Sequence, residues 1–64
     1  MRNQMAALRE KRSMTQADLA RLLDVSRQTV ISIEKGRYAP SLPLAFRIAA
    51  VFGLTIEEIF TPDE

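Results

Sequence analysis

Helix start and stop signals follow one another so closely along this sequence that only short helices fit between them. Hydroxyl residues that favour the N-cap position precede four apolar segments, and glycine or proline ends three of these. Two starts are capping boxes, "TQAD" from Thr15 and "TIEE" from Thr55, in which the acidic residue three positions after the cap reaches back to it. The other caps and stops are Ser26, Ser41, Gly36, Gly53 and Pro62.

These signals predict five helices, at about residues 3–12, 15–23, 26–35, 41–52 and 55–60. No segment alternates apolar and polar residues with the period of two that indicates a strand. We therefore expect an all-α, compact five-helix fold, with residues 1–64 forming a single domain. A chain this short buries only about 60% of the surface that it exposes when unfolded, so it holds one small core.

The residue types present argue against catalysis and metal binding. The chain has no Cys and no His, and so it lacks thiolate chemistry, the usual zinc ligand and the usual general base. We expect no catalytic residue, no metal site and no cofactor. Its longest apolar run is far below the roughly 18 residues of a membrane span, and "MRNQMAALREKRS" lacks the apolar core of a secretory signal, which predicts a cytoplasmic protein without a membrane partner.

Charge is distributed unevenly along the chain although the net charge is only +1. The first 47 residues hold all nine Lys and Arg and four acidic residues, whereas the last 17 hold only the other four acidic residues. The two parts therefore carry net charges of +5 and −4. Ordinary solvated charge gives such a pattern, and so does a basic end that meets a polyanion.

The helix predicted after Ser26 has one apolar and one polar side. Val25 before the cap and Val30 inside the helix are spaced as a hydrophobic staple, and at about 100° per residue Ile33 shares the inward side with them. Amide, hydroxyl and ammonium groups lie opposite, on Gln28, Ser32 and Lys35. These groups suit a DNA major groove, although a solvated face has the same composition.

The preceding helix favours the DNA interpretation. Two capped helices joined by a turn of three or four residues match a helix-turn-helix, whose second helix enters the major groove while the first crosses the phosphate backbone. Thr15 and Gln16 then lie at a helix N-terminus, where free N–H groups and the helix dipole suit a phosphate.

From Met5 to Phe60 the sequence resembles the Cro/C1-type helix-turn-helix family, also called the XRE family, which has the lambda-repressor-like fold. The resemblance is carried by "TQADLARLLDVSRQTVISIEKGRYAPSLPLAFRIAAVFGLTIEEIF", and most specifically by Gln16, Ala20, "VSRQTV", "IEKG" and "PSL". It is closest to minimal, single-domain members of the family, which occur in prokaryotes and phages. It implies a DNA-binding domain in which the second and third helices form the helix-turn-helix.

The resemblance also implies roles for matching residues. Gln16 matches a phosphate-contacting glutamine. Positions that contact base edges in the family are occupied by Arg27, Gln28 and Ser32, and positions that touch the DNA backbone by Lys35, Arg37 and Tyr38.

Alternative interpretations exist for Ile31, Lys35 and Tyr38. Ile31 occupies a commonly polar position, and it either meets a thymine methyl group or packs sideways against the second helix. Lys35 would complement the helix dipole even without DNA. The ring of Tyr38 can cover the edge of the core while its hydroxyl lies near a phosphate.

Glu34 lies in the last turn of the third helix, where a carboxylate opposes the helix dipole. Its position near the core side calls for a partner, because a partly buried carboxylate is otherwise uncompensated. The family resemblance points to Arg9. We expect Arg9 and Glu34 to form a structural ion pair.

The fourth helix has more apolar surface than one small domain encloses. Nine of its eleven residues from Leu42 to Phe52 are apolar, whereas an amphipathic helix needs only one apolar stripe. This surplus predicts a homodimer. Its interface is expected to lie away from the basic face and to include Leu54, Ile56, Ile59 and Phe60 as well. The acidic, proline-bearing tail "TPDE" leaves open whether the termini form the short β-pairing of some minimal relatives.

Together these features predict a sequence-specific, homodimeric DNA-binding regulator, a repressor, that inserts its third helix into the major groove of a near-palindromic operator. No small-molecule effector is predicted. The alternatives are a protein-interaction module that keeps the fold without the DNA contacts, and the antitoxin of a toxin–antitoxin pair. Arg27 and Gln28 argue against the first, and the near absence of a tail argues against the second.

Overall fold

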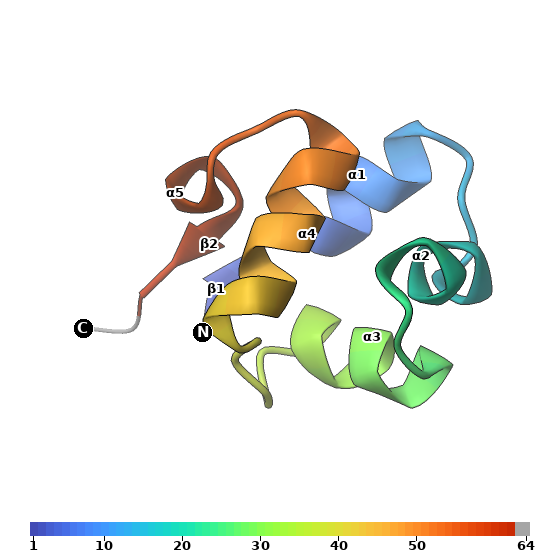
Figure 1. Ribbon diagram of the computed structural model, residues 1–64, viewed down its shortest axis with the longest axis horizontal. Coiled ribbons are helices and arrows are strands. Elements are labelled where there is room, and N and C mark those ends of the chain that lie inside the picture. The colour runs from blue at the N-terminus through green and yellow to red at the C-terminus, as the bar shows by residue number, and fades with distance from the viewer. Residues whose placement is uncertain (63–64) are drawn as a thin grey trace.

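The computed structural model describes residues 1–62, which form five short helices and two very short strands (Figure 1). Asp63 and Glu64, which belong to the predicted acidic tail, lie outside the described residues. The elements in chain order are β1 (Arg2–Asn3), α1 (Met5–Lys11), α2 (Gln16–Leu23), α3 (Arg27–Glu34), α4 (Leu42–Phe52), α5 (Ile56–Ile59) and β2 (Phe60–Thr61).

The predicted helix starts are confirmed by their hydrogen bonds. In the first capping box, the Asp18 N–H donates to Thr15 Oγ1 at 3.0 Å, and the Thr15 N–H donates to Asp18 Oδ2 at 2.9 Å. The hydrogen bond from the Thr15 N–H to the carboxylate lowers the pKa of the Asp18 carboxyl, because it favours the charged form. Thr55 and Glu58 form the second box, and the hydroxyls of Ser26 and Ser41 cap α3 and α4.

A tight turn joins α2 to α3, as predicted. Asp24 adopts a left-handed conformation with φ of 58°, and the Val25 N–H donates to the Ala20 carbonyl at 3.0 Å, which closes α2. Val25 packs against the core, to which the fully buried Val30 also belongs. The turn and these contacts fix the angle between α2 and α3 (Figure 1).

Gly36 ends α3 in the left-handed conformation, with φ of 76°. Its N–H donates to the Ile33 carbonyl at 2.9 Å, and the Arg37 N–H donates to the Ser32 carbonyl at 3.0 Å. A Cβ atom at Gly36 would also lie 2.9 Å from the Met1 carbonyl oxygen. Both the backbone angle and this close approach therefore require glycine.

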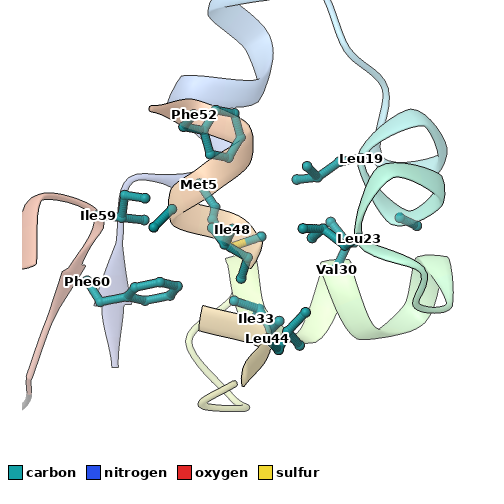
Figure 2. Packing of buried hydrophobic residues seen from close by; sticks show 12 residues of the cluster. Met5, Leu19, Leu23, Val30, Ile33, Leu44, Ile48, Phe52, Ile59 and Phe60 are labelled. Carbon is teal, nitrogen blue, oxygen red and sulfur yellow. The ribbon is translucent and has the colours of Figure 1, made fainter. Parts of the chain in front are cut away.

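The core is built around α4, which packs against α2 and α5 (Figure 1). Figure 2 shows Leu19, Leu23 and Val30 facing it from the helix-turn-helix, and Ile59 and Phe60 facing it from the C-terminal side. Ile48, in the middle of α4, is fully buried among them. α3 is thus held by the same core as the other helices.

The strand pair corrects the expectation that no strand forms and answers the question left open about the termini. β1 and β2 are antiparallel, with Arg2 opposite Thr61 and Asn3 opposite Phe60. Two-residue strands are too short to show alternation in a sequence, so their pairing comes from tertiary structure. It also shortens two predicted helices, because Asn3 lies in β1 and Phe60, with φ of −111° and ψ of 138°, is extended.

Ile59 and Phe60 were predicted to lie at a dimer surface, and the structure shows that this is wrong for both. Their exposed fractions are 1% and 6%, and both belong to the core (Figure 2). Side chains that their own chain already encloses leave no area for a partner. Leu54 and Ile56 are only partly buried.

Candidate nucleic-acid interface

The outer side of α3 carries the side chains predicted to read bases. Arg27 and Gln28, in its first turn, are exposed, and Ser32 one turn later is half-buried. Gln28 and Ser32 also line a shallow hollow together with Ser26, Thr29 and Tyr38. Amide and hydroxyl groups therefore gather on one surface of a helix whose other side is anchored in the core.

Ile31 is half-buried, so it contributes to packing and keeps part of its surface accessible. This position fits either of the two roles considered for it. Contact with a thymine methyl group stays a prediction.

Gln16, at the start of α2, is hydrogen-bonded to Glu34 of the predicted ion pair and to Arg27, which was predicted to read bases. Its Nε2 donates to Glu34 Oε1 at 3.1 Å, and its Oε1 accepts from Arg27 Nη2 at 3.4 Å. The amide thus lies between a carboxylate at the end of α3 and a guanidinium at its beginning. No local sequence pattern predicts this bridge, because Gln16 lies 11 residues from Arg27 and 18 residues from Glu34.

Arg9 and Glu34 meet as expected. Arg9 Nε donates to Glu34 Oε2 at 2.8 Å, Arg9 Nη2 donates to Glu34 Oε1 at 3.3 Å, and the two side chains are only 12% and 7% exposed. The hydrogen bond from Arg9 to Glu34 raises the pKa of the Arg9 guanidinium. Arg9 Nη1 also donates to the Met14 carbonyl at 2.9 Å, which ties the loop before α2 into the same network.

A second hollow lies at the beginning of α2, where Thr15 and Gln16 were predicted to meet a phosphate. It is lined by Arg9, Thr15, Gln16, Ala17 and Arg27, among others. The Thr15 hydroxyl already accepts from the Asp18 N–H, which leaves the first N–H groups of α2 facing this end of the helix. The N-terminus of α2 and the Arg27 side chain therefore border one open hollow of about 490 Å³.

Lys35, Arg37 and Tyr38 follow α3 and are all exposed, with 47% of Tyr38 accessible. The ion pairs within residues 1–62 do not involve Arg27, Lys35 or Arg37. These cations are thus available to an external anion. The exposed ring of Tyr38 borders the hollow beside Ser32, so it faces the candidate interface.

Sequence reasoning missed two side-chain contacts that hold the helices of the fold together. Asn3 Nδ2 donates to the Ile33 carbonyl at 2.8 Å, and Asn3 Oδ1 accepts from the Met5 N–H at 3.1 Å, so that this one side chain clamps α1 to the end of α3. Arg12 donates to the Val51 and Phe52 carbonyls at the end of α4. No sequence signal marks either contact, because both join segments at least 30 residues apart.

An apolar groove lies between α4 and α5. Leu42 and Phe46 are 64% and 60% exposed, and they line the groove together with Ala49, Leu54 and Ile56. The surplus of apolar residues on α4 was predicted, but not which of them would stay outside the core. This groove is formed by residues other than those that carry the candidate DNA contacts.

Residues 1–62 contain neither a cluster of metal-binding side chains nor a membrane-spanning helix. These residues contain no group of three or more His, Cys, Asp or Glu side chains placed to hold a metal ion. Likewise, no helix in the described part of the chain is long and apolar enough to cross a membrane.

Known proteins resemble this chain in sequence. The model of a helix-turn-helix family matches residues 5–59. An HTH-type transcriptional regulator from Methanocaldococcus jannaschii is 57% identical over 60 residues, which are 94% of this chain and 91% of the relative. The immunity repressor protein of Bacillus phage phi105 is 36% identical over 53 residues, 83% of this chain and 37% of the repressor.

A solved structure agrees with the fold. The crystal structure of a transcriptional regulator from Listeria innocua superposes with a TM-score of 0.79 at 25% sequence identity. The match covers 100% of this chain and 64% of that one. The chain therefore belongs to the Cro/C1-type, or XRE, family of helix-turn-helix transcriptional regulators, which are DNA-binding proteins and not enzymes.

Proposed function

We propose that this regulator is a homodimeric repressor that inserts α3 into the major groove of a near-palindromic operator. The observation that carries the proposal is the outer side of α3, where exposed Arg27 and Gln28 lie on a helix whose inner side is fixed in the core. A reading helix needs both properties, because mobile side chains on a loosely held helix discriminate poorly between bases. As a regulator of prokaryotic or phage DNA, the protein would act in the cytoplasm.

Base reading in this proposal falls to the residues on that side of α3. Arginine forms a bidentate pair with the O6 and N7 of guanine, and an amide pairs with the N6 and N7 of adenine, so we assign guanine to Arg27 and adenine to Gln28. Ser32 accepts from or donates to either partner, and Ile31 offers its accessible methyl groups to thymine.

Phosphate contacts would flank the base-reading surface on two sides. Thr15 and Gln16 supply the N-terminus of α2, and Lys35, Arg37 and Tyr38 supply exposed donors after α3. The bridge from Gln16 to Arg27 adds a second task for the glutamine. When Gln16 contacts a phosphate, it also holds the Arg27 guanidinium beside the major groove of the DNA.

A second copy of the chain fits the apolar groove between α4 and α5. Leu42 and Phe46, both more than half exposed, line this groove together with Ala49, Leu54 and Ile56. A two-fold interface places the same surface of both subunits in contact, so this apolar lining would be buried from both sides. A dimer also doubles the small contact area of a single eight-residue recognition helix. Occlusion of an operator by such a dimer would repress transcription, in keeping with the name of the phage relative.

The proposal is tested by measuring the affinities of Arg27→Ala and Gln28→Ala for an operator selected with the parent protein and for a random duplex. Loss of a base contact should cost about 1–3 kcal/mol on the operator and little on random DNA. The matched control is Arg21→Ala, which removes an exposed cation from α2 and leaves α3 unchanged. Equal losses on both duplexes for Arg27→Ala and Gln28→Ala would contradict the assignment.

A further inference from the structure

A polar hollow lies where β1 meets the end of α3, outside the helix-turn-helix itself. Arg2 and Lys35 line it, together with Asn3, Gly36 and Thr61. Its volume is about 440 Å³, ample for a phosphate group and its first water molecules. In Figure 1 the N-terminal segment lies beside the loop that leaves α3, which brings this hollow to the same end of the molecule as the recognition helix.

The hollow presents unpaired positive charge. Arg2 and Lys35 are exposed, and the ion pairs found within residues 1–62 include neither of them. Glu34 also borders the hollow, but its two carboxylate oxygens already accept hydrogen bonds from Arg9 and Gln16. The acidic group nearby is therefore compensated, whereas the two cations are not.

Carbonyl groups at the end of a helix would ordinarily repel an anion, and here several of them are already satisfied. The Ile33 carbonyl accepts from Asn3 Nδ2 and from the Gly36 N–H, and the Ser32 carbonyl accepts from the Arg37 N–H. The Gly36 carbonyl accepts from the Met1 nitrogen at 3.2 Å. Three carbonyl groups at or just after the end of α3 therefore already accept hydrogen bonds.

Arg2 is held in place through its backbone. β1 pairs with β2, which sets Arg2 opposite Thr61, and the neighbouring Asn3 side chain is bonded at both ends, to α1 and to α3. The position of Arg2 relative to Lys35 is thus fixed by contacts that do not use the arginine side chain. Removing its charge would leave these contacts intact.

We propose that this hollow is a phosphate-binding site in which Arg2 acts together with Lys35 on the DNA backbone. The inference rests on the proposed function and extends the DNA interface from the helix-turn-helix to the paired termini. Two cations that line one hollow at the end of a recognition helix match the chemistry of a phosphodiester, and the contact would position the protein without reading bases.

The first test compares Arg2→Gln with Arg21→Gln, since each variant removes one exposed positive charge. For Arg2→Gln, the slope of log affinity against log salt should fall by about 0.9, the value for one phosphate, equally on operator and random DNA. Arg21→Gln should keep the parental slope. Thermal midpoints equal to that of the parent would show that both variants fold.

The second test locates the phosphate. We use a series of operators, each with a single phosphate replaced by a neutral methylphosphonate. At the phosphate that Arg2 contacts, this replacement should lower the affinity of the parent protein but not that of Arg2→Gln. Inorganic phosphate at constant ionic strength should not compete, which separates a site for backbone phosphate from a site for the free ion. The inference is overturned if Arg2→Gln keeps the parental salt slope and the two methylphosphonate profiles coincide, or if inorganic phosphate competes. A parent protein that does not bind DNA would instead refute the proposed function.

Discussion

Arg9 Nε lies 2.8 Å from Glu34 Oε2, and this nearly buried ion pair joins α1 to the last turn of the recognition helix. Glu34 accepts from Gln16 as well, and Gln16 accepts from Arg27, so the pair is the inner end of a chain of polar groups that reaches the surface. The ion pair thus links the stability of the fold to the position of a residue proposed to read bases.

Removing one partner of this pair should strongly destabilise the protein. Glu34→Ala leaves the Arg9 guanidinium nearly buried without its carboxylate, which costs roughly 3–5 kcal/mol. Urea unfolding measures the change. Arg21→Ala breaks an exposed pair with Asp18, whose N–O distance is 3.5 Å, and should cost at most about 1 kcal/mol. Equal effects of the two variants would mean that the Arg9–Glu34 contact does not stabilise the fold.

Replacing Lys35 distinguishes a contact with DNA from a contribution to the stability of α3 alone. If its ammonium contacts a phosphate, Lys35→Ala should weaken binding to all sequences alike and reduce the salt slope by about one unit. If it only complements the dipole of α3, the variant should be slightly less stable and keep its salt slope. Fluorescence anisotropy titrations between about 50 and 200 mM salt distinguish the two outcomes.

The capping box of α2 should contribute to the pH dependence of stability. Hydrogen bonds from Thr15 lower the pKa of Asp18 in the folded protein. The ionised carboxylate therefore stabilises the folded state, and this stabilisation is fully present above the ordinary pKa of an aspartate, about 3.9. That contribution is lost as pH falls through the lowered value. Asp18→Asn should therefore lose less stability than the parent between pH 7 and about pH 2.5. Parallel curves in urea unfolding would show that the charge of Asp18 does not matter.

Much of the fold follows from local chemistry that can be read in the sequence. The capping boxes at Thr15 and Thr55, the serine caps and Gly36 are decided within a few residues, and all occur as predicted. The contact between Arg9 and Glu34 was expected from the family resemblance together with the cost of an unpaired carboxylate near the core.

What could not be predicted depends on segments that meet only in the folded chain. The pairing of Asn3 with Phe60 has no periodic signal, and it draws Phe60 into the core and away from the surface assigned to it. An apolar composition showed that α4 has surface to spare, but the exposure of Phe46 follows from how α4 packs against its neighbours. The bridge from Gln16 to Arg27 likewise needs the angle between α2 and α3.

Dimerisation should be separable from folding. Phe46→Glu places a charge at an exposed position of the apolar groove, so helical content should be unchanged while operator affinity falls, because each subunit loses the contacts of the other. Ala50→Glu, at an exposed position of α4 that does not line the groove, is the control. Analytical ultracentrifugation at micromolar concentration checks this. The dimer would be contradicted by a parent protein that sediments alone as a 7.2 kDa monomer and that binds a palindromic operator as a single chain per duplex.

Selection of bound sites from random DNA, carried out in parallel with the parent and with Gln28→Ala, tests the central claim most directly. If a dimer reads bases with α3, the parent should enrich a near-palindrome whose half-sites are centred about 10–10.5 base pairs apart, or a multiple of this spacing. Gln28→Ala should enrich the same pattern with the preference relaxed at one base pair of each half-site. No enrichment by the parent, or an identical preference at every position in both proteins, would contradict the account.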